Sequence, residues 1–396
     1  MKPGQVLSSI GYSLHELDLS FASHQLCVAT GHLGLCHRKS LAFPQPGYSP
    51  TRLGGSDMAA NTPGEVHQRW IDQVHEEPLE PDLPICDPHH HLWLDEGHTG
   101  WPYGLSDLHA DTGAGHNVVR TVYLECHAEY RTDGPRHLRP VGETEFVVEL
   151  AEQSAASGGA EIAGIMGNAD LTLGDAVEEV LEAHETAGRG RFRGVRYITA
   201  QDPHPPLAMG VSTAMDDPSY LAGVRKVGAM GYTYDSMVYH PQLPELAGVA
   251  RACPNTPIVV DHLGGFLGTG PYKDRRPEIL ETWRASMTEL AACSNTFLKV
   301  GGIGMPMMGF RWDKQDSPPN SEELAEPWAE PIQWVIEQFG TDRCMFESNF
   351  PVDKRGSGYV VLWNAFKRIA AAYSADEKRE LFHDTAARAY RLPTLG

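Results

Sequence analysis

Three consecutive histidines, His89-His90-His91, end a short apolar run that begins at Leu83. In an extended strand, residues two positions apart face the same side, so His89 and His91 can converge on one point while His90 faces away. Two converging imidazoles suit a divalent cation such as zinc. We therefore predict that His89 and His91 bind a metal, with a structural role for both as the alternative.

A third histidine, His262, ends another apolar run, at positions 258–261. A histidine at the end of a strand can bind a metal, or it can donate a hydrogen bond to a substrate carbonyl and polarise it. A hydrogen-bonded core histidine is the alternative. Because His89 and His91 already indicate a site, we assign His262 to catalysis.

Charged residues stand inside or next to other runs of this kind. Asp235 is a candidate ligand partner or general base. Glu125 ends one run and Lys299 lies late in another, and a buried Glu125–Lys299 ion pair is the alternative to a catalytic role for both. Arg193 and Arg196 are three positions apart, so they face opposite sides of a strand and one of them points inward.

The runs themselves are short and β-branched, and beyond residue 82 they alternate with longer stretches of helical periodicity. This alternation is typical of βα units. Strands are expected at Leu83–Pro88, Arg120–Cys126, Glu161–Gly167, Phe192–Ile198, Tyr232–Met237, Pro257–His262, Thr296–Gly301 and Cys344–Asn349. Helices are expected at Glu65–His75, Thr144–Ser157, Asp175–Ala187, Tyr220–Met230, Leu243–Cys253, Pro277–Cys293 and Pro331–Phe339. Eight βα steps without a dinucleotide fingerprint predict an α/β fold, a closed (β/α)8 TIM barrel, with a doubly wound sheet as the alternative.

Composition and charge restrict the partners and the compartment. Lys and Arg total 32 against 52 for Asp and Glu, and the net charge of −20 argues against nucleic acid or an anionic membrane as the partner. The seven cysteines are widely spaced without a Cys-x-x-Cys pair, which favours reduced thiols in the cytoplasm. A small-molecule substrate is the expected partner, and a homo-oligomer is left open.

The first part of the chain lacks sustained periodicity. We interpret residues 1–57 as a poorly structured extension or as a consequence of a translation start assigned too early, since Met58 is followed by a plausible short helix. Residues 58–82 are then a short lead-in, and residues 83–396 are the barrel.

Four elements together resemble the amidohydrolase-related family of metal-dependent barrel hydrolases, which includes sugar-lactone and dicarboxylate lactonases. They are the Asp87-x-His89-x-His91 start, His262, the Ser348-Asn349-Phe350-Pro351 segment and the closing helical segment at 385–392. The resemblance spans roughly residues 83–393.

The resemblance also implies roles for individual residues. Family members carry an aspartate on the eighth strand that binds metal, activates water, or does both. Asn349 stands there in this chain and has no titratable proton acceptor, so the metal, zinc or manganese, is left open. Glu347, two residues earlier, is the nearest replacement carboxylate, unless it is an interior residue paired with a cation. For Asp353 we expect a surface pairing with Lys354, although the loop could also bring it into the site. The family's Gly-x-Arg pattern selects Arg196 as the inward arginine.

We therefore predict a hydrolase that opens a lactone or similar cyclic ester of a small polar or carboxylated compound. Glu347 or Asp235 would activate water, Arg196 would bind a substrate carboxylate, and Trp93 would wall the pocket. A metal-assisted decarboxylase of an aromatic or muconate-type acid is one alternative. A catalytically impaired barrel that binds a small ligand is the other.

Overall fold

All eight predicted runs form parallel strands, and each strand pairs with the next one along the chain. The computed structural model describes residues 62–394. The strands are β1 (Ile85–His90), β2 (Val118–Leu124), β3 (Glu161–Asn168), β4 (Phe192–Ile198), β5 (Thr233–Met237), β6 (Ile258–Val260), β7 (Thr296–Lys299) and β8 (Cys344–Met345). The predicted extension at 1–57 and the start of the lead-in lie outside the described residues.

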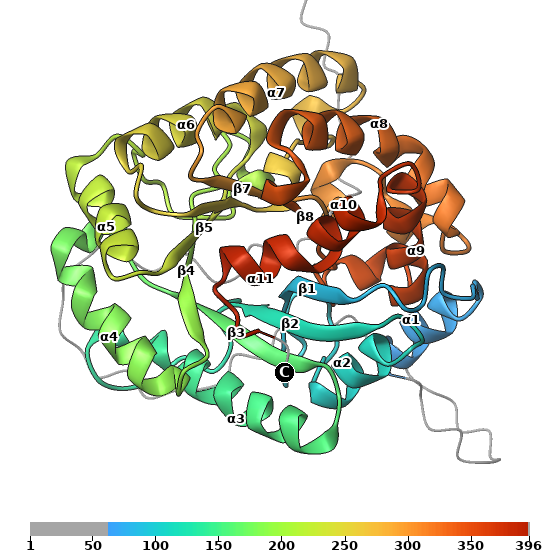
Figure 1. The fold of residues 1–396 in the computed structure, drawn as a ribbon, viewed down its shortest axis with the longest axis horizontal. Coiled ribbons are helices and arrows are strands. Elements are labelled where there is room, and N and C mark those ends of the chain that lie inside the picture. The colour runs from blue at the N-terminus through green and yellow to red at the C-terminus, as the bar shows by residue number, and fades with distance from the viewer. Residues whose placement is uncertain (1–61, 395–396) are drawn as a thin grey trace, which may run out of the picture. The chain divides into compact units, whose positions relative to one another are not determined.

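Helices surround the strands, and most of them follow a strand and lie around the outside of the sheet (Figure 1). They are α1 (Pro63–Ile71), α2 (Leu105–Thr112), α3 (Val141–Ser157), α4 (Val177–Gly188), α5 (Pro218–Ala229), α6 (Leu243–Ala252), α7 (Arg276–Ala291), α8 (Ser321–Phe339), α9 (Tyr359–Ile369), α10 (Ala375–Arg379) and α11 (Thr385–Ala389). The predicted (β/α)8 barrel is therefore confirmed. Within residues 62–394, none of the helices has the length and apolar character needed to cross a membrane.

The barrel closes where the segment after β8 returns to β1. The amide of Asn349 donates to the carbonyl of His89 at 2.9 Å, and the amide of His91 donates to the carbonyl of Phe350 at 2.8 Å. The buried carboxylate of Asp87 on β1 accepts from the Ser348 amide at 2.9 Å, which ties the same two segments together. This closing seam places the histidines directly beside the residues that follow β8.

The opposite end of the barrel is covered by the C-terminal segment. Ala386, Ala389 and Tyr390 belong to the same buried cluster as Val122 and Val259 from the barrel strands. Figure 1 shows α11 lying across the strands. Because the first residue of β5, Thr233, donates its hydroxyl to the Ala389 carbonyl at 2.8 Å, the covered end is the N-terminal one. The C-terminal end is therefore where a site can form.

The strands predicted at 257–262, 296–301 and 344–349 end later than β6, β7 and β8, whose last residues are Val260, Lys299 and Met345. His262 and Asn349 both have a φ of 54°, in the left-handed region, so neither can continue a β-strand. The helix predicted at Pro331–Phe339 was too short at its N-terminus: α8 starts after Asn320, whose side chain accepts from the amide of Glu323 at 2.9 Å, and contains both Pro327 and Pro331. A proline inside a helix is costly, and this cost misled the prediction.

Candidate active site

The three histidines predicted from the sequence meet at the C-terminal ends of β1 and β6. The ring centroids of His89 and His262 are 4.5 Å apart, and Nε2 of His89 lies 3.2 Å from Nε2 of His91. All three side chains are buried. His90 faces the other way, as predicted, and packs edge-on against Tyr123. His89, His91 and His262 therefore form one buried cluster, and His90 lies outside it.

Glu347 joins two of these histidines. Its Oε1 accepts from Nδ1 of His262 at 2.9 Å, and its Oε2 lies 2.7 Å from Nδ1 of His89. The carboxylate is fully buried, and the backbone that follows β7 leaves room for it: a Cβ on Gly301 would lie 2.5 Å from Cγ of Glu347, and a Cβ on Gly302 would lie 2.0 Å from Nδ1 of His262. The two glycines are thus required by the site, and the glycine pair after β7 was the signal for them in the sequence.

His89, His262 and Glu347 could hold a metal ion, because their ligand atoms lie within 4.8 Å of one another. The contact between Glu347 Oε2 and His89 Nδ1 lacks hydrogen-bond geometry, which leaves a buried carboxylate oxygen without a donor among the described residues. A bound cation satisfies such an oxygen, and imidazole with carboxylate is a donor set suited to zinc. The residues present therefore fit a divalent metal. His91 is outside this group, and its predicted role as a ligand stays a prediction.

Protonation of the histidines depends on the charges around them. Burial, together with the positive charge of Lys299, lowers the pKa of His89 well below its ordinary value. Burial and Arg196 do the same for the pKa of His91. Burial is the largest single influence on His262 and lowers its pKa, but the charge and hydrogen bond of Glu347, together with the charge of Asp261, raise it, and the net shift is upward. His89 and His91 are therefore neutral near pH 7, the state that binds metals.

Lys299 lies beneath His89 in a group of fully buried charges. Its ammonium nitrogen is 2.7 Å from Oδ2 of Asp235, 3.0 Å from Oδ1 of Asp261 and 3.2 Å from Nδ1 of His89. The hydroxyl of Tyr390 in the C-terminal segment donates to the same Asp235 oxygen at 2.8 Å. Asp235 is thus held by two donors below the histidines, which suits a supporting role better than that of a base.

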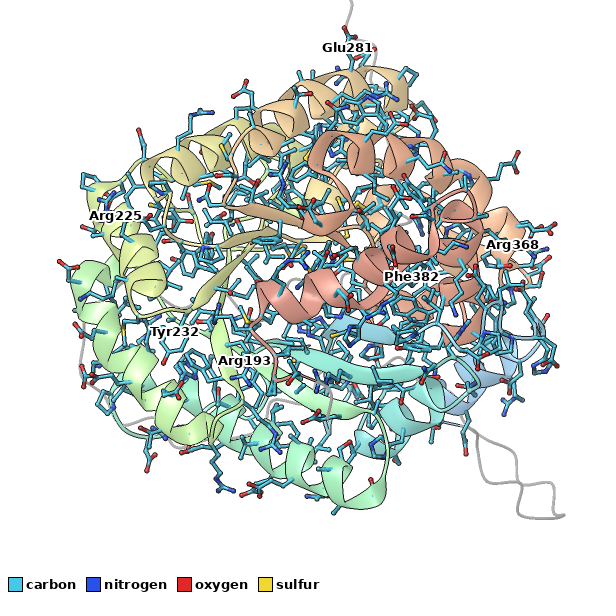
Figure 2. All side chains as sticks on the ribbon, in the orientation of Figure 1. Arg193, Arg225, Tyr232, Glu281, Arg368 and Phe382 are labelled. Carbon is cyan, nitrogen blue, oxygen red and sulfur yellow. The ribbon has the colours of Figure 1, made fainter. Side chains whose placement is uncertain are left out.

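Arg196 is the arginine that points into the barrel. Its Nε donates to Oε1 of Glu125 at 2.9 Å, a second nitrogen donates to the Glu125 carbonyl, and Nη1 lies 3.4 Å from Nε2 of His89. The suggested Glu125–Lys299 ion pair is therefore wrong, since each residue has a different partner. Arg193 lies beside the C-terminal segment (Figure 2), where its carbonyl accepts from Arg391 at 2.7 Å.

Asn349 binds the carboxylate of Asp353, for which a surface position was expected and a place in the site was the alternative. Its amide nitrogen donates to Oδ1 of Asp353 at 3.0 Å, and Oδ2 of Asp353 accepts from the amide of Gly304 at 2.9 Å. Asp353 is only 2% exposed. The expected surface pairing of Asp353 with Lys354 is wrong, because Lys354 pairs instead with Asp111 at 2.8 Å. The four-residue spacing from Asn349 was the available signal.

Trp93 lies next to His91, with the two rings roughly parallel and their centroids 6.1 Å apart. Its indole nitrogen donates to the carbonyl of Trp101 at 2.9 Å, and the Trp101 ring stacks on His67 of α1 at 4.5 Å. This places Trp93 where a pocket wall was predicted, and it connects the wall to the lead-in helix.

Comparisons with known proteins agree with this arrangement. Residues 86–392 match the amidohydrolase family. The chain is 31% identical to the uncharacterized protein y4mH of Sinorhizobium fredii, over 78% of this chain and 99% of that protein. It is 29% identical to an L-fucono-1,5-lactonase of Burkholderia multivorans, over 76% of this chain and 97% of the relative. A crystal structure of an amidohydrolase from Burkholderia multivorans with bound zinc has a TM-score of 0.61 and 25% identity, covering 78% of this chain and 99% of that one.

A parallel barrel with buried histidines at its C-terminal end, matched over most of its length, defines the class of the protein. This chain belongs to the amidohydrolase family. The family resemblance predicted from the sequence is therefore confirmed, and so is hydrolase chemistry at this general level.

Proposed function

We propose that this protein hydrolyses a lactone, opening the ring of a small polar or carboxylated compound. The observation that carries the proposal is the buried cluster of His89, His91, His262 and Glu347 at the C-terminal end of the barrel, with Arg196 beside it. The similarity to an L-fucono-1,5-lactonase supports a sugar-derived lactone as the substrate class.

A divalent ion, zinc or manganese, would be held by His89, His262 and Glu347, with His91 as the further ligand predicted from the sequence. When bound, it supplies a Lewis acid that polarises the ester carbonyl. The zinc found in the amidohydrolase from Burkholderia multivorans supports zinc as the first ion to test.

The side chains around the histidines orient the substrate and stabilise charge. Glu347 accepts from Nδ1 of His262 and so leaves Nε2 as the edge of that ring that is available to metal or substrate. Arg196 directs Nη1 toward His89, where its positive charge stabilises the oxyanion that develops on the carbonyl oxygen. Trp93 covers His91 on one side, which keeps bulk water from the imidazoles.

The protein is also proposed to work in the cytoplasm. Cys86, Cys126, Cys253, Cys293 and Cys344, the cysteines within residues 62–394, are all free and buried, as expected for a reducing compartment.

A panel of sugar 1,5- and 1,4-lactones, including L-fucono-1,5-lactone, tests the proposal. Purified protein is assayed by acid release and by NMR of the product, before and after chelation and with zinc or manganese restored. Ring opening above the spontaneous rate supports the proposal. CO2 release from an aromatic or muconate-type acid, with no lactone opened, would instead identify the decarboxylase predicted as the alternative.

A further inference from the structure

Lactone hydrolysis requires a base for the attacking water, and each residue considered for this role from the sequence is engaged by other groups or lacks a titratable acceptor. Asn349 has no titratable acceptor. Asp235 is held below the histidines by Lys299 and Tyr390. Oε1 of Glu347 accepts from Nδ1 of His262, and Oε2 is the buried oxygen without a donor within residues 62–394 that a bound metal would satisfy. A further carboxylate is needed at the C-terminal end of the barrel.

Asp353 is placed to fill this role. It follows the strand-eight segment and lies against Gly304 in the loop after β7, so two loops at the C-terminal end of the barrel hold it. Each of its oxygens accepts one hydrogen bond, from Asn349 and from Gly304, and keeps a second lone pair. A carboxylate can only accept, so the amide nitrogen of Asn349 must be the atom that faces it. A Cβ on Gly304 would lie 2.9 Å from Oδ2 of Asp353, so the loop is shaped around this group.

We propose that Asp353 is the general base of the lactonase reaction and that Asn349 is the positioning residue that orients it. The assignment rests on the proposed function. The family carries its aspartate at the position of Asn349, whereas this chain has the carboxylate four residues later, at Asp353. The side-chain amide of Asn349 then holds that carboxylate in the site.

The reaction balances with Asp353 as the single proton carrier. Asp353 takes one proton from water while the water oxygen forms a bond to the carbonyl carbon. The ring C–O bond then breaks, and the ring oxygen leaves with the proton that Asp353 returns. The product acid ionises and releases one proton to solvent, which leaves Asp353 as a carboxylate for the next turnover.

The surroundings of Asp353 support this assignment. Burial raises its pKa to about 7, while the Gly304 amide and the charge of His262 lower it and Glu347 raises it. The groups that face Asp353 are thus His262 after β6, the Gly304 amide after β7, and Glu347 and Asn349 after β8. Lys354, its neighbour in sequence, is neutralised by Asp111. A base whose pKa lies near the working pH combines the ionised form with good proton affinity.

The test compares Asp353→Asn with the exchange variant Asn349→Asp/Asp353→Asn, which moves the carboxylate back to position 349. Asp111→Asn is the matched control, because it removes another largely enclosed carboxylate, 14% exposed, that pairs with Lys354 and makes no contact with the histidines of the site. For each protein, kcat and KM are measured between about pH 5 and about pH 9 on the best lactone of the panel, with circular dichroism melting as the check on folding.

The kcat of the wild type should rise with pH through neutral pH, as Asp353 ionises. We expect Asp353→Asn to remove this rise and to lower kcat by about 10²- to 10⁴-fold with little change in KM. The exchange variant should recover at least about tenfold of the loss. Asp111→Asn should keep the rise, even if it melts earlier. An Asp353→Asn protein that keeps wild-type kcat and the same pH profile overturns the assignment, and so does an equal loss at every pH that the exchange variant does not recover. If the wild-type protein opens no lactone, the proposed function itself fails, and the role of Asp353 fails with it.

Discussion

Replacing Lys299 with methionine tests the buried charge group beneath the histidines. The ammonium of Lys299 lies 2.7 Å from Asp235 and 3.0 Å from Asp261, and all three side chains are fully buried. Methionine keeps most of the apolar stem, so the loss of charge is the main change. Removing one partner of a buried ion pair costs about 3–5 kcal/mol, because the remaining charge is buried without compensation. We expect the free energy of unfolding to fall by about this amount near pH 8.

The size of this effect should depend on pH. Burial raises the pKa of Asp235 to about 6, although Lys299 opposes the shift, so the pKa rises further when Lys299 is removed. A carboxyl group with a higher pKa in the folded than in the unfolded protein makes the folded protein bind more protons, and stability then falls as pH rises. The destabilisation should therefore be smallest near pH 5 and should grow toward pH 8.

Urea unfolding followed by circular dichroism, in buffer with a chelator, measures this free energy at both pH values. Lys226→Met is the matched control, since Lys226 pairs with Glu178 at 2.9 Å on the surface, and it should unfold like the wild type. Adding Asp235→Asn to Lys299→Met should recover part of the loss. A Lys299→Met protein within about 1 kcal/mol of the wild type at both pH values would refute the reasoning, because such a value is typical of an exposed pair.

Three further predictions concern the glycine beside His262, a buried carboxyl and the metal. Gly302→Ala should lower both melting temperature and turnover, because its Cβ would lie 2.0 Å from Nδ1 of His262; Gly158→Ala, also at positive φ but with open space around it, should show only the modest backbone cost in a melting experiment. Burial raises the pKa of Glu143 to about 8, so its contribution to the free energy of unfolding falls as pH rises toward 8. Urea unfolding of Glu143→Gln should not show this fall. Chelation should lower the turnover of a lactone, and zinc should restore it, as measured by acid release with metal analysis.

The sequence was sufficient for the fold and for the convergence of the three histidines. Periodicity identified eight strands because each run is short, β-branched and separated by helical stretches, and strand-end polarity identified His89, His91 and His262. The partners of charged side chains inside the barrel could not be predicted from the sequence in the same way. Parity correctly placed Lys299 inside the barrel, but it says nothing about which of several inward carboxylates lies opposite, so Glu125 was proposed where Asp235 and Asp261 stand.

Asp353 was misplaced for a different reason. Its position depends on the backbone beyond β8, which turns at Asn349 with a φ of 54°, whereas the prediction continued the strand through Asn349. The charge next to it, Lys354, suggested a surface pair. The structure gives that lysine to Asp111 on α2, a partner 243 positions away in the sequence.

The most direct test of the central claim is the rate of lactone ring opening by the wild-type protein and by His89→Ala/His91→Ala, each corrected for spontaneous hydrolysis. We predict that the wild type opens at least one sugar lactone well above the spontaneous rate, in water labelled with oxygen-18, with one label in the product carboxylate. The double variant should show only the spontaneous rate. Full turnover by the double variant, or no lactone opened by the wild type, would contradict the account.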